Sequence, residues 1–297
     1  MLNLKKLTTE SRNPNTMDLD TKSSLEIVTI MNQEDNNVIK AVNEVLPEIA
    51  TAVDWCAEAL ANGGRMIYMG AGTSGRLAVQ DSVECPPTFG VDKDVVTALL
   101  AGGAGATKVA QEGAEDHAEY GIADLKYINC TSKDIVIGIA ASGRTPYVIG
   151  GFEYAKELGC KTVSIACNKN AAMSKYADLA IEPDNGPEIL TGSSRLKSGT
   201  SQKMILNMLS TGAMIKMGKV YQNLMVDVKQ TNEKLVDRAQ RIIMEATGCT
   251  REEAVAMNEA AHGKVKVAII MIMLSCDEQT ALAKLEETKG HIRAAIQ

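Results

Sequence analysis

Short runs of apolar residues that alternate with helix-like segments constrain the fold of this chain more than any other feature. The runs cover residues 65–69, 95–100, 135–140, 162–166 and 179–181. The helix-like segments between them cover residues 75–83, 107–120, 147–158 and 171–176. Apolar runs of this length are typical of buried parallel strands, and their alternation with helices predicts a doubly wound α/β sheet. Such sheets bind ligands beyond the carboxyl ends of their strands, so we expect the chemistry in those loops.

The segments on either side of this pattern predict further parts of the chain. Residues 1–17 are polar and suggest a loose arm, after which a capping box at Ser23-Ser-Leu-Glu26 predicts a helix to about residue 32. A second helical stretch covers 37–62 and stops at Gly63-Gly64, and a long helix runs from about 200 to 216. Thr250 and Asp277 are expected helix caps in a C-terminal part without strand patterns. We therefore predict N-terminal helices over 1–62, a sheet domain over 63–237 and a small three-helix module over 238–297.

Composition and charge exclude several classes of function. The net charge of −6, with one tryptophan, seven tyrosines and two phenylalanines, disfavours a nucleic-acid partner. The seven cysteines are odd in number and contain no Cys-x-x-Cys pair, which favours reduced thiols over disulfides or a zinc site. The N-terminus lacks the apolar core of a signal peptide, and no apolar run reaches the length of a membrane span. We expect a cytoplasmic protein without a membrane partner.

The loop after the first apolar run has two interpretations. Gly70-Ala-Gly-Thr-Ser-Gly75 fits the G-x-G-x-x-G pattern of dinucleotide-binding folds. That interpretation requires an acidic residue at the end of the second strand, whereas Asp92 and Asp94 precede the strand. The hydroxyls of Thr73 and Ser74 at the turn instead suit the oxygens of a terminal phosphate. The sequence therefore disfavours NAD or FAD and favours a phosphate loop.

Two later segments repeat this chemistry. Ala141-Ser-Gly-Arg-Thr145 follows the third apolar run and shares the Ser-Gly-Arg triplet of the first loop, and 191–200 holds five hydroxyls and two cations before another helix. Helix N-termini attract anions through their unpaired N–H groups. Ordinary capping explains most such sites singly, but three helix-opening loops in one domain favour phosphate binding. The candidate ligand-binding residues are Gly72, Thr73, Ser74, Ser142, Gly143, Arg144, Thr145, Ser193, Ser194 and Lys197.

Carboxylates are the candidates for acid–base catalysis, because only three histidines are present. Glu84 precedes Pro86-Pro87, which predicts that the helix opened by the first loop ends near Glu84. A carboxylate at that end meets the negative end of the helix dipole, so Glu84 is either functional or an ordinary surface residue. Glu112 and Glu115 share a face of the helix expected there. The residues alone do not choose between Glu112, Glu115 and Asp116, and His117 beside them is more typical of a neighbour than of the base.

Together these segments resemble the sugar isomerase (SIS) fold and, more closely, the N-acetylmuramic acid 6-phosphate etherases. The resemblance extends over nearly the whole chain, and Glu84-Cys-Pro-Pro87 and Thr191-Gly-Ser-Ser-Arg195 are its most specific segments. The other matching segments are Gly70-Ala-Gly-Thr-Ser-Gly-Arg-Leu77, Glu112-Gly-Ala-Glu-Asp116, Gly138-Ile-Ala-Ala-Ser-Gly-Arg-Thr-Pro-Tyr147 and Asn223-Leu-Met-Val-Asp227.

The resemblance implies hydrolytic removal of D-lactate from N-acetylmuramic acid 6-phosphate in the recycling of cell-wall amino sugars. It implies that Glu84 is the acid that protonates the departing lactate and that Glu115 is the base at C2. It also implies a homodimer with composite sites, and the chemistry requires no metal or other cofactor. Two alternatives use the same loops. A sugar-phosphate isomerase would need a carboxylate base at C2 but no second acid for a leaving group, and a sugar-phosphate-sensing regulator would bind its ligand without turnover.

Overall fold

The computed structural model describes residues 7–230 and 232–297 and divides into two compact units. The first, here called the sheet unit, contains the residues up to Val83 and Asp94–Ser210. The second, here called the helical unit, contains Glu84–Lys93 and Thr211–Gln297. These bounds differ from the predicted division at 237/238, because the second unit begins already at Thr211 and also includes Glu84–Lys93, so it holds the ends of two helices that begin in the sheet unit.

The sheet unit is built on five parallel strands in the order β2-β1-β3-β4-β5. Strands β1 and β3 at its centre are buried along their whole length, as expected for strands covered on both faces. The predicted α/β fold with a parallel sheet is therefore confirmed, and each observed strand begins and ends within one residue of its predicted range. The strands are β1 (Met66–Gly70), β2 (Val96–Leu100), β3 (Ile135–Ile139), β4 (Lys161–Ile165) and β5 (Leu179–Ile181).

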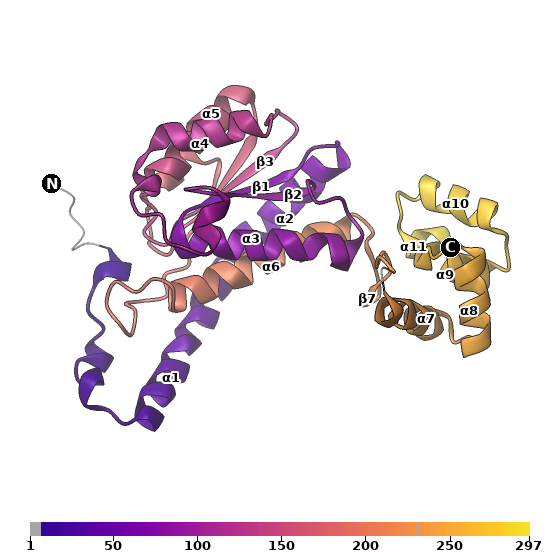
Figure 1. Cartoon of the computed structure of the whole chain (residues 1–297), viewed down its shortest axis with the longest axis horizontal. Coiled ribbons are helices and arrows are strands. Elements are labelled where there is room, and N and C mark those ends of the chain that lie inside the picture. Colours follow the sequence, from indigo (N-terminus) through magenta and orange to yellow (C-terminus); the bar gives the residue numbers. More distant parts are fainter. Residues whose placement is uncertain (1–6, 231) are drawn as a thin grey trace. The chain divides into compact units, whose positions relative to one another are not determined.

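Helices cover both faces of this sheet (Figure 1). One face carries α4 and α5, and the other carries α2, α3 and α6. The two faces are used in turn because the chain leaves β1 toward one edge of the sheet and leaves β2 toward the other. The bounds are α2 (Leu46–Ala61), α3 (Gly72–Phe89), α4 (Ala118–Tyr127), α5 (Pro146–Leu158) and α6 (Lys197–Lys216).

Residues 7–17 are not the loose arm that their polarity suggested. Residues 1–6 lie outside the described part of the chain, but Thr9 and Asn13 are buried. Thr9 N donates to Asn168 Oδ1 at 3.4 Å, and Asn13 Nδ2 donates to the Glu34 carboxylate at 2.9 Å. Polar residues can therefore hold this segment in place, because hydrogen bonds satisfy the groups that are buried.

Helix α1 (Ser24–Asn43) begins at the predicted capping box, with the Ser23 side chain and Glu26 hydrogen-bonded reciprocally. The prediction that this helix ends near 32 is wrong, because α1 continues to Asn43. The interruption before α2 lies at residues 44–45, directly before the Pro47 turn. Proline fits the first turn of a helix and cannot donate the backbone bond that would join the two helices.

Two further helix predictions require correction. Helix α3 does not end near Glu84 but continues through Pro86 and Pro87 to Phe89. Each proline removes one backbone N–H donor, yet its ring holds a φ compatible with the helix. The helix predicted over 107–120 is absent: the segment forms short 3₁₀ turns at Ala104–Thr107 and Ala114–Asp116, and α4 begins only at Ala118. Gly113, with a left-handed φ of 84°, separates the second turn from the residues before it.

Within its described residues, the helical unit contains a two-stranded antiparallel ribbon and five complete helices, where we expected three. The Asn232, Thr250 and Asp277 side chains each accept a backbone N–H at a helix start, as predicted for the last two. Apolar residues of α9 form the centre of its core. The elements are β6 (Val220–Tyr221), β7 (Leu224–Met225), α7 (Glu233–Thr247), α8 (Arg251–Ala260), α9 (Val265–Leu274), α10 (Glu278–Glu287) and α11 (Ile292–Ala295).

No helix in the described part of the chain combines the length and the apolar character needed to cross a bilayer.

Candidate functional site

The loops that carry the predicted phosphate-binding residues lie next to one another at the carboxyl edge of the sheet. Strand β1 is central to this arrangement, since Gly70 at its end pairs in register with Ile139 of β3 on one side and Leu100 of β2 on the other. The loops after β1, β2 and β3 therefore leave the sheet at the same level. This edge is where α/β sheets bind their ligands.

The first loop turns directly from β1 into α3. Helix α3 begins at Gly72, whose φ of 53° is left-handed. The first N–H groups of a helix have no acceptor within the helix. A Cβ on Gly75 would lie 2.4 Å from Leu100 Cδ1 and 2.6 Å from Gly70 O, so only glycine allows this close approach. The Arg76 guanidinium donates to Ala106 O at 2.9 Å and so holds the loop that follows β2.

The second loop, after β3, is hydrogen-bonded to the segment after β4. Met173 N donates to Gly143 O at 2.9 Å, and Asn168 Nδ2 donates to Ala141 O at 3.0 Å. Thr145 is the N-cap of α5, and Pro146 occupies the first helical position. The side chains of Ser142, Arg144 and Thr145 are half-buried. Their backbone is thus fixed while the side chains remain partly accessible.

The third cluster, at the start of α6, lies against the first turn of α3. Ser74 Oγ donates to Gln202 Oε1 at 2.9 Å, and a Cβ on Gly199 would lie 3.7 Å from Thr73 Cγ2. Ser193 and Ser194 are half-buried residues just before α6. Two segments more than a hundred residues apart therefore meet at this edge, as the three-loop hypothesis requires.

Protein carboxylates pair with Lys197 and with the backbone N–H groups at the start of α6. Lys197 is 1% exposed, and its Nζ lies 2.7 Å from Glu34 Oε2 of α1. The fully buried Glu188 carboxylate accepts from the backbone N–H groups of Lys197 and Ser198, both at 2.9 Å. This is the anion position of the α6 N-terminus. Lys197 remains a proposed ligand-binding residue, but here its charge is neutralised by Glu34.

Glu34 is itself held by several donors. Asn13 Nδ2 and Asn15 Nδ2 donate to its carboxylate at 2.9 and 3.1 Å, and both residues belong to the N-terminal segment. Burial alone would raise the pKa of Glu34, but the hydrogen bonds from Lys197, Asn15 and Asn13 outweigh burial, so its pKa is lowered. Glu34 is therefore held in its ionised form as the partner of Lys197.

Sequence reasoning missed Glu34, Glu188 and Gln202. Glu188 Oε1 accepts from Ser198 N ten residues later, Gln202 pairs with Ser74 across 128 residues, and Lys197 pairs with Glu34 across 163. No local pattern indicates the partner of Glu34 or of Gln202. An acidic residue shortly before a Ser/Thr-rich helix start was the one available signal, and it indicates Glu188 alone.

Glu115 lies in the 3₁₀ turn at Ala114–Asp116, beyond the end of β2 in the sheet unit. Reduced hydration of the carboxyl, followed by repulsion from Asp116 and Glu112, raises its pKa above the ordinary value for glutamate. Glu112 does not share a helix face with Glu115, because no helix forms there. A carboxylate with a raised pKa is a stronger base once ionised, which suits proton abstraction.

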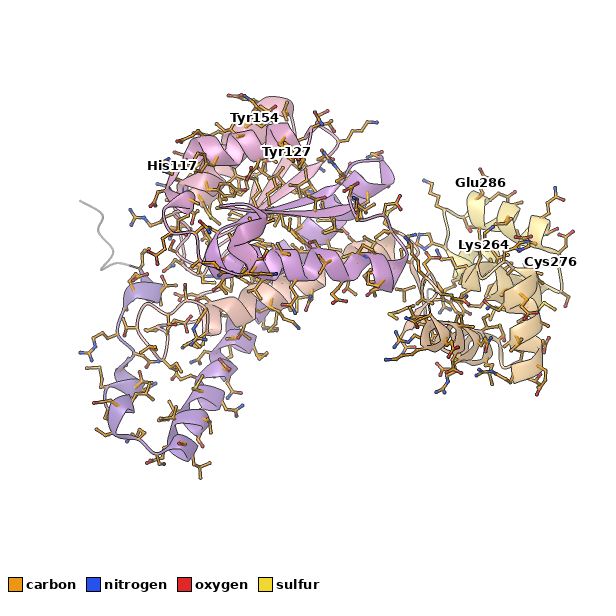
Figure 2. The ribbon with its side chains drawn as sticks, viewed as in Figure 1. His117, Tyr127, Tyr154, Lys264, Cys276 and Glu286 are labelled. Atoms are coloured by element: carbon orange, nitrogen blue, oxygen red, sulfur yellow. The ribbon has the colours of Figure 1, made fainter. Side chains whose placement is uncertain are left out.

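The neighbouring His117 faces other residues. Its Nδ1 lies 2.9 Å from Glu119 Oε1, and its ring stacks on Tyr120 with 4.6 Å between the ring centroids. Figure 2 shows His117 in the sheet unit, where it comes immediately before α4. Both contacts are with residues on the first turn of α4, so His117 is tied to that helix.

Glu84 is an exposed residue of α3, five residues before the end of the helix. It is not at the helix terminus, so the predicted unfavourable encounter with the dipole does not arise there. The helix crosses from one unit to the other between Val83 and Glu84, which places Glu84 in the helical unit and Glu115 in the sheet unit.

Neither unit presents a metal-binding group in its described residues, judged by clusters of three or more His, Cys, Asp or Glu side chains.

Comparisons with known proteins agree with the fold. Residues 48–156 match the family described as the glucokinase regulatory protein N-terminal SIS domain. Among solved structures, a Bacteroides fragilis protein involved in capsule formation aligns over 68% of this chain and 95% of its own, with a TM-score of 0.51 and 18% identity. At that identity the likeness concerns the fold alone.

Curated relatives match over the whole length. An N-acetylmuramic acid 6-phosphate etherase from Cronobacter sakazakii is 58% identical over 296 residues, which is 100% of both chains. One from Geobacillus is 56% identical over 99% of this chain and 100% of its own, and N-acetylmuramic acid 6-phosphate etherase 2 from Vibrio cholerae is 54% identical over 99% and 96%. Identity at this level extends through both units. The chain belongs to the N-acetylmuramic acid 6-phosphate etherase family.

Proposed function

We propose that this protein is an N-acetylmuramic acid 6-phosphate etherase of cell-wall amino-sugar recycling. The single observation that carries the proposal is the 58% identity over the full length of a relative with that name. The reaction eliminates D-lactate from the sugar and adds water, which yields N-acetylglucosamine 6-phosphate. The enzyme is thus a carbon–oxygen lyase that acts on a sugar phosphate.

The carboxyl edge of the sheet is the proposed phosphate site. Hydroxyl groups come from all three loops. They belong to Thr73 and Ser74 in the first loop, Ser142 and Thr145 in the second, and Ser193 and Ser194 before α6. The starts of α3 and α5 supply backbone N–H groups with the positive end of each helix dipole. Donors from adjacent loops would suit the oxygens of one phosphate.

Glu115 is the proposed base and Glu84 the proposed acid. In the opened sugar the C2 hydrogen is acidic because it is alpha to the aldehyde. Glu115 takes that proton, a C2–C3 double bond forms, the C3–O bond breaks, and Glu84 protonates the departing lactate oxygen. Water then adds across the double bond, its oxygen at C3 and its proton at C2. The raised pKa of Glu115 supports its part in this scheme.

The function is tested by incubating the full chain with N-acetylmuramic acid 6-phosphate and assaying D-lactate. We expect stoichiometric lactate and N-acetylglucosamine 6-phosphate. A sugar-phosphate isomerase or a sensing regulator would release no lactate, and its absence at high enzyme concentration would overturn the proposal.

The two catalytic roles are separated in D₂O. Glu84→Ala should still exchange the C2 hydrogen with solvent but release little lactate, because the base remains and the acid is lost. Glu115→Ala should lose both reactions. Exchange at the wild-type rate in Glu115→Ala would assign the base to another residue, with Glu112 and His117 the next to test.

We further propose a cytoplasmic homodimer. Leu25, Val28 and Ile39 share one side of α1 and are 75%, 56% and 59% exposed, which is unusual for aliphatic side chains of one helix. A second copy of the chain would cover this apolar stripe. A cytoplasmic location agrees with the seven free cysteines, which a reducing compartment would keep as thiols.

A further inference from the structure

The end of α3 is packed with the C-terminal helices rather than with the sheet. Residues Glu84–Lys93 form one compact unit with Thr211–Gln297, although only the helix joins them in sequence to the phosphate loop. The helical unit therefore holds the segment that carries Glu84. This gives the C-terminal part of the chain a candidate role in the reaction.

Gly90, the first residue after α3, sits directly on the backbone of Asp227. A Cβ on Gly90 would lie 2.2 Å from Asp227 O and 3.5 Å from Asp227 Cβ, and its φ of 68° is left-handed. Next to it, Lys229 Nζ donates to Val91 O at 3.4 Å. The turn that ends α3 thus rests on the segment that follows β7.

The Asp227 side chain fastens this segment to the rest of the helical unit. Its Oδ2 lies 2.6 Å from Nζ of Lys266 in α9 and 3.1 Å from Nζ of Lys219, which comes just after α6. The side chains of Asp227 and Lys266 are 21% and 11% exposed. Breaking a largely buried ion pair by removing one partner is unfavourable, since the other charge stays buried. The ion pairs therefore hold the Asp227 backbone in place, and with it the backbone oxygen that lies next to Gly90.

We propose that Asp227 is a positioning residue for Glu84. It acts through Gly90: the ion pairs with Lys266 and Lys219 hold the Asp227 backbone, and this backbone sets where the last turns of α3 lie. The inference rests on the proposed role of Glu84 as the acid. A displacement of about 1 Å in a catalytic group can reduce the rate by about 100-fold, so a loosened helix end would impair lactate protonation.

The test uses the full chain with N-acetylmuramic acid 6-phosphate in D₂O and measures two quantities. These are the deuterium at C2 of the remaining substrate and the D-lactate released. In Asp227→Asn we expect lactate release to fall by about 10-fold or more while C2 exchange changes by less than about 2-fold, because the base is in the other unit. Gly90→Ala should give the same split, since its Cβ would displace the turn from Asp227 O.

Asp237→Asn is the matched control, because it removes an exposed aspartate of the same unit that pairs with Arg241 and Arg251 on the surface. It should keep the wild-type ratio of exchange to lactate. Circular dichroism establishes whether each variant is folded. If Asp227→Asn does not fold, Gly90→Ala alone tests the positioning role. A purely structural role would lower both rates together.

The outcomes separate this inference from the proposed function. No lactate from the wild-type chain would overturn the function itself. Lactate from the wild type, its loss in Glu84→Ala, and an unchanged ratio in folded Asp227→Asn or Gly90→Ala would overturn the positioning role alone.

Discussion

Side chains at the carboxyl edge of the sheet differ in whether the protein already supplies their partner. Ser74 pairs with Gln202, and Lys197 pairs with Glu34 in a buried contact, whereas Ser142 and Thr145 are partly accessible. A buried pair holds its side chain in place at a high desolvation cost. At the residue scale, Ser142 and Thr145 therefore offer more accessible hydroxyl groups than the buried Ser74, and Lys197 is held rigidly by its ion pair.

The acidic neighbours of Glu115 predict a pH effect. Burial, Asp116 and Glu112 together raise the pKa of Glu115, and the ionised form is the active base. The rate of C2 exchange should therefore fall as the pH falls through this raised pKa. Asp116→Asn removes one negative neighbour, so the acidic limb of the pH–rate profile should move to lower pH.

The profile is best measured at low ionic strength, because salt screens exposed charges. Glu157→Gln is the control: it removes a charge near the end of α5, at the opposite edge of the sheet, and should leave the limb in place. A limb at the same pH in Asp116→Asn would contradict the assignment of Glu115 as the base.

At the scale of elements, close approaches that only glycine permits decide how helices meet the sheet. Gly138 lies in the central strand β3 below α5, and a Cβ there would lie 2.3 Å from Val148 Cγ1 and 2.4 Å from Phe152 Cζ. Both neighbours are fully buried and have no space in which to move. Helix α5 begins directly after the second loop, and its packing against the sheet thus depends on Gly138.

Gly138→Ala should lower the free energy of unfolding by about 1–3 kcal/mol, the usual effect of overpacking a core. Gly105→Ala is the control, because a Cβ there meets nothing within 4 Å, and it should change stability by less than about 0.5 kcal/mol. Urea unfolding followed by the fluorescence of Trp55, the single tryptophan, reports on the sheet unit. Equal stability of the two variants would contradict the packing argument.

At the scale of the whole molecule, two helices continue across the boundary between the units. Helix α3 crosses between Val83 and Glu84, and α6 crosses between Ser210 and Thr211. The proposed catalytic pair is divided by this boundary, and the proposed dimer surface lies on α1 of the sheet unit.

The dimer proposal predicts the effect of charges on the α1 stripe. Val28→Glu with Ile39→Glu should shift the protein toward the monomer in sedimentation equilibrium, because two carboxylates would be buried without partners. Gln33→Glu adds a carboxylate at an exposed position on another side of the same helix and should leave the association unchanged. Unaltered association in the double variant would place the interface elsewhere.

Local patterns were sufficient for much of the fold. Apolar runs located all five strands within one residue, and Ser23, Thr250 and Asp277 cap helices as their neighbours predicted. These features depend on residues a few positions apart, so the sequence displays them directly. Two helix predictions failed for a local reason as well. The prolines after Glu84 lie inside a helix, because their φ is compatible with it, and Gly113 interrupts 107–120.

The sequence by itself determined the sheet, its order of loops and the chemical type of the candidate side chains. Only the tertiary structure decided their partners: Glu34 for Lys197, Gln202 for Ser74, and the Asp227 backbone oxygen next to Gly90. These pairs lie more than a hundred residues apart, and no periodicity relates their positions. The physical reason is that burial and Coulomb attraction act across space, between groups that meet only once the chain has folded.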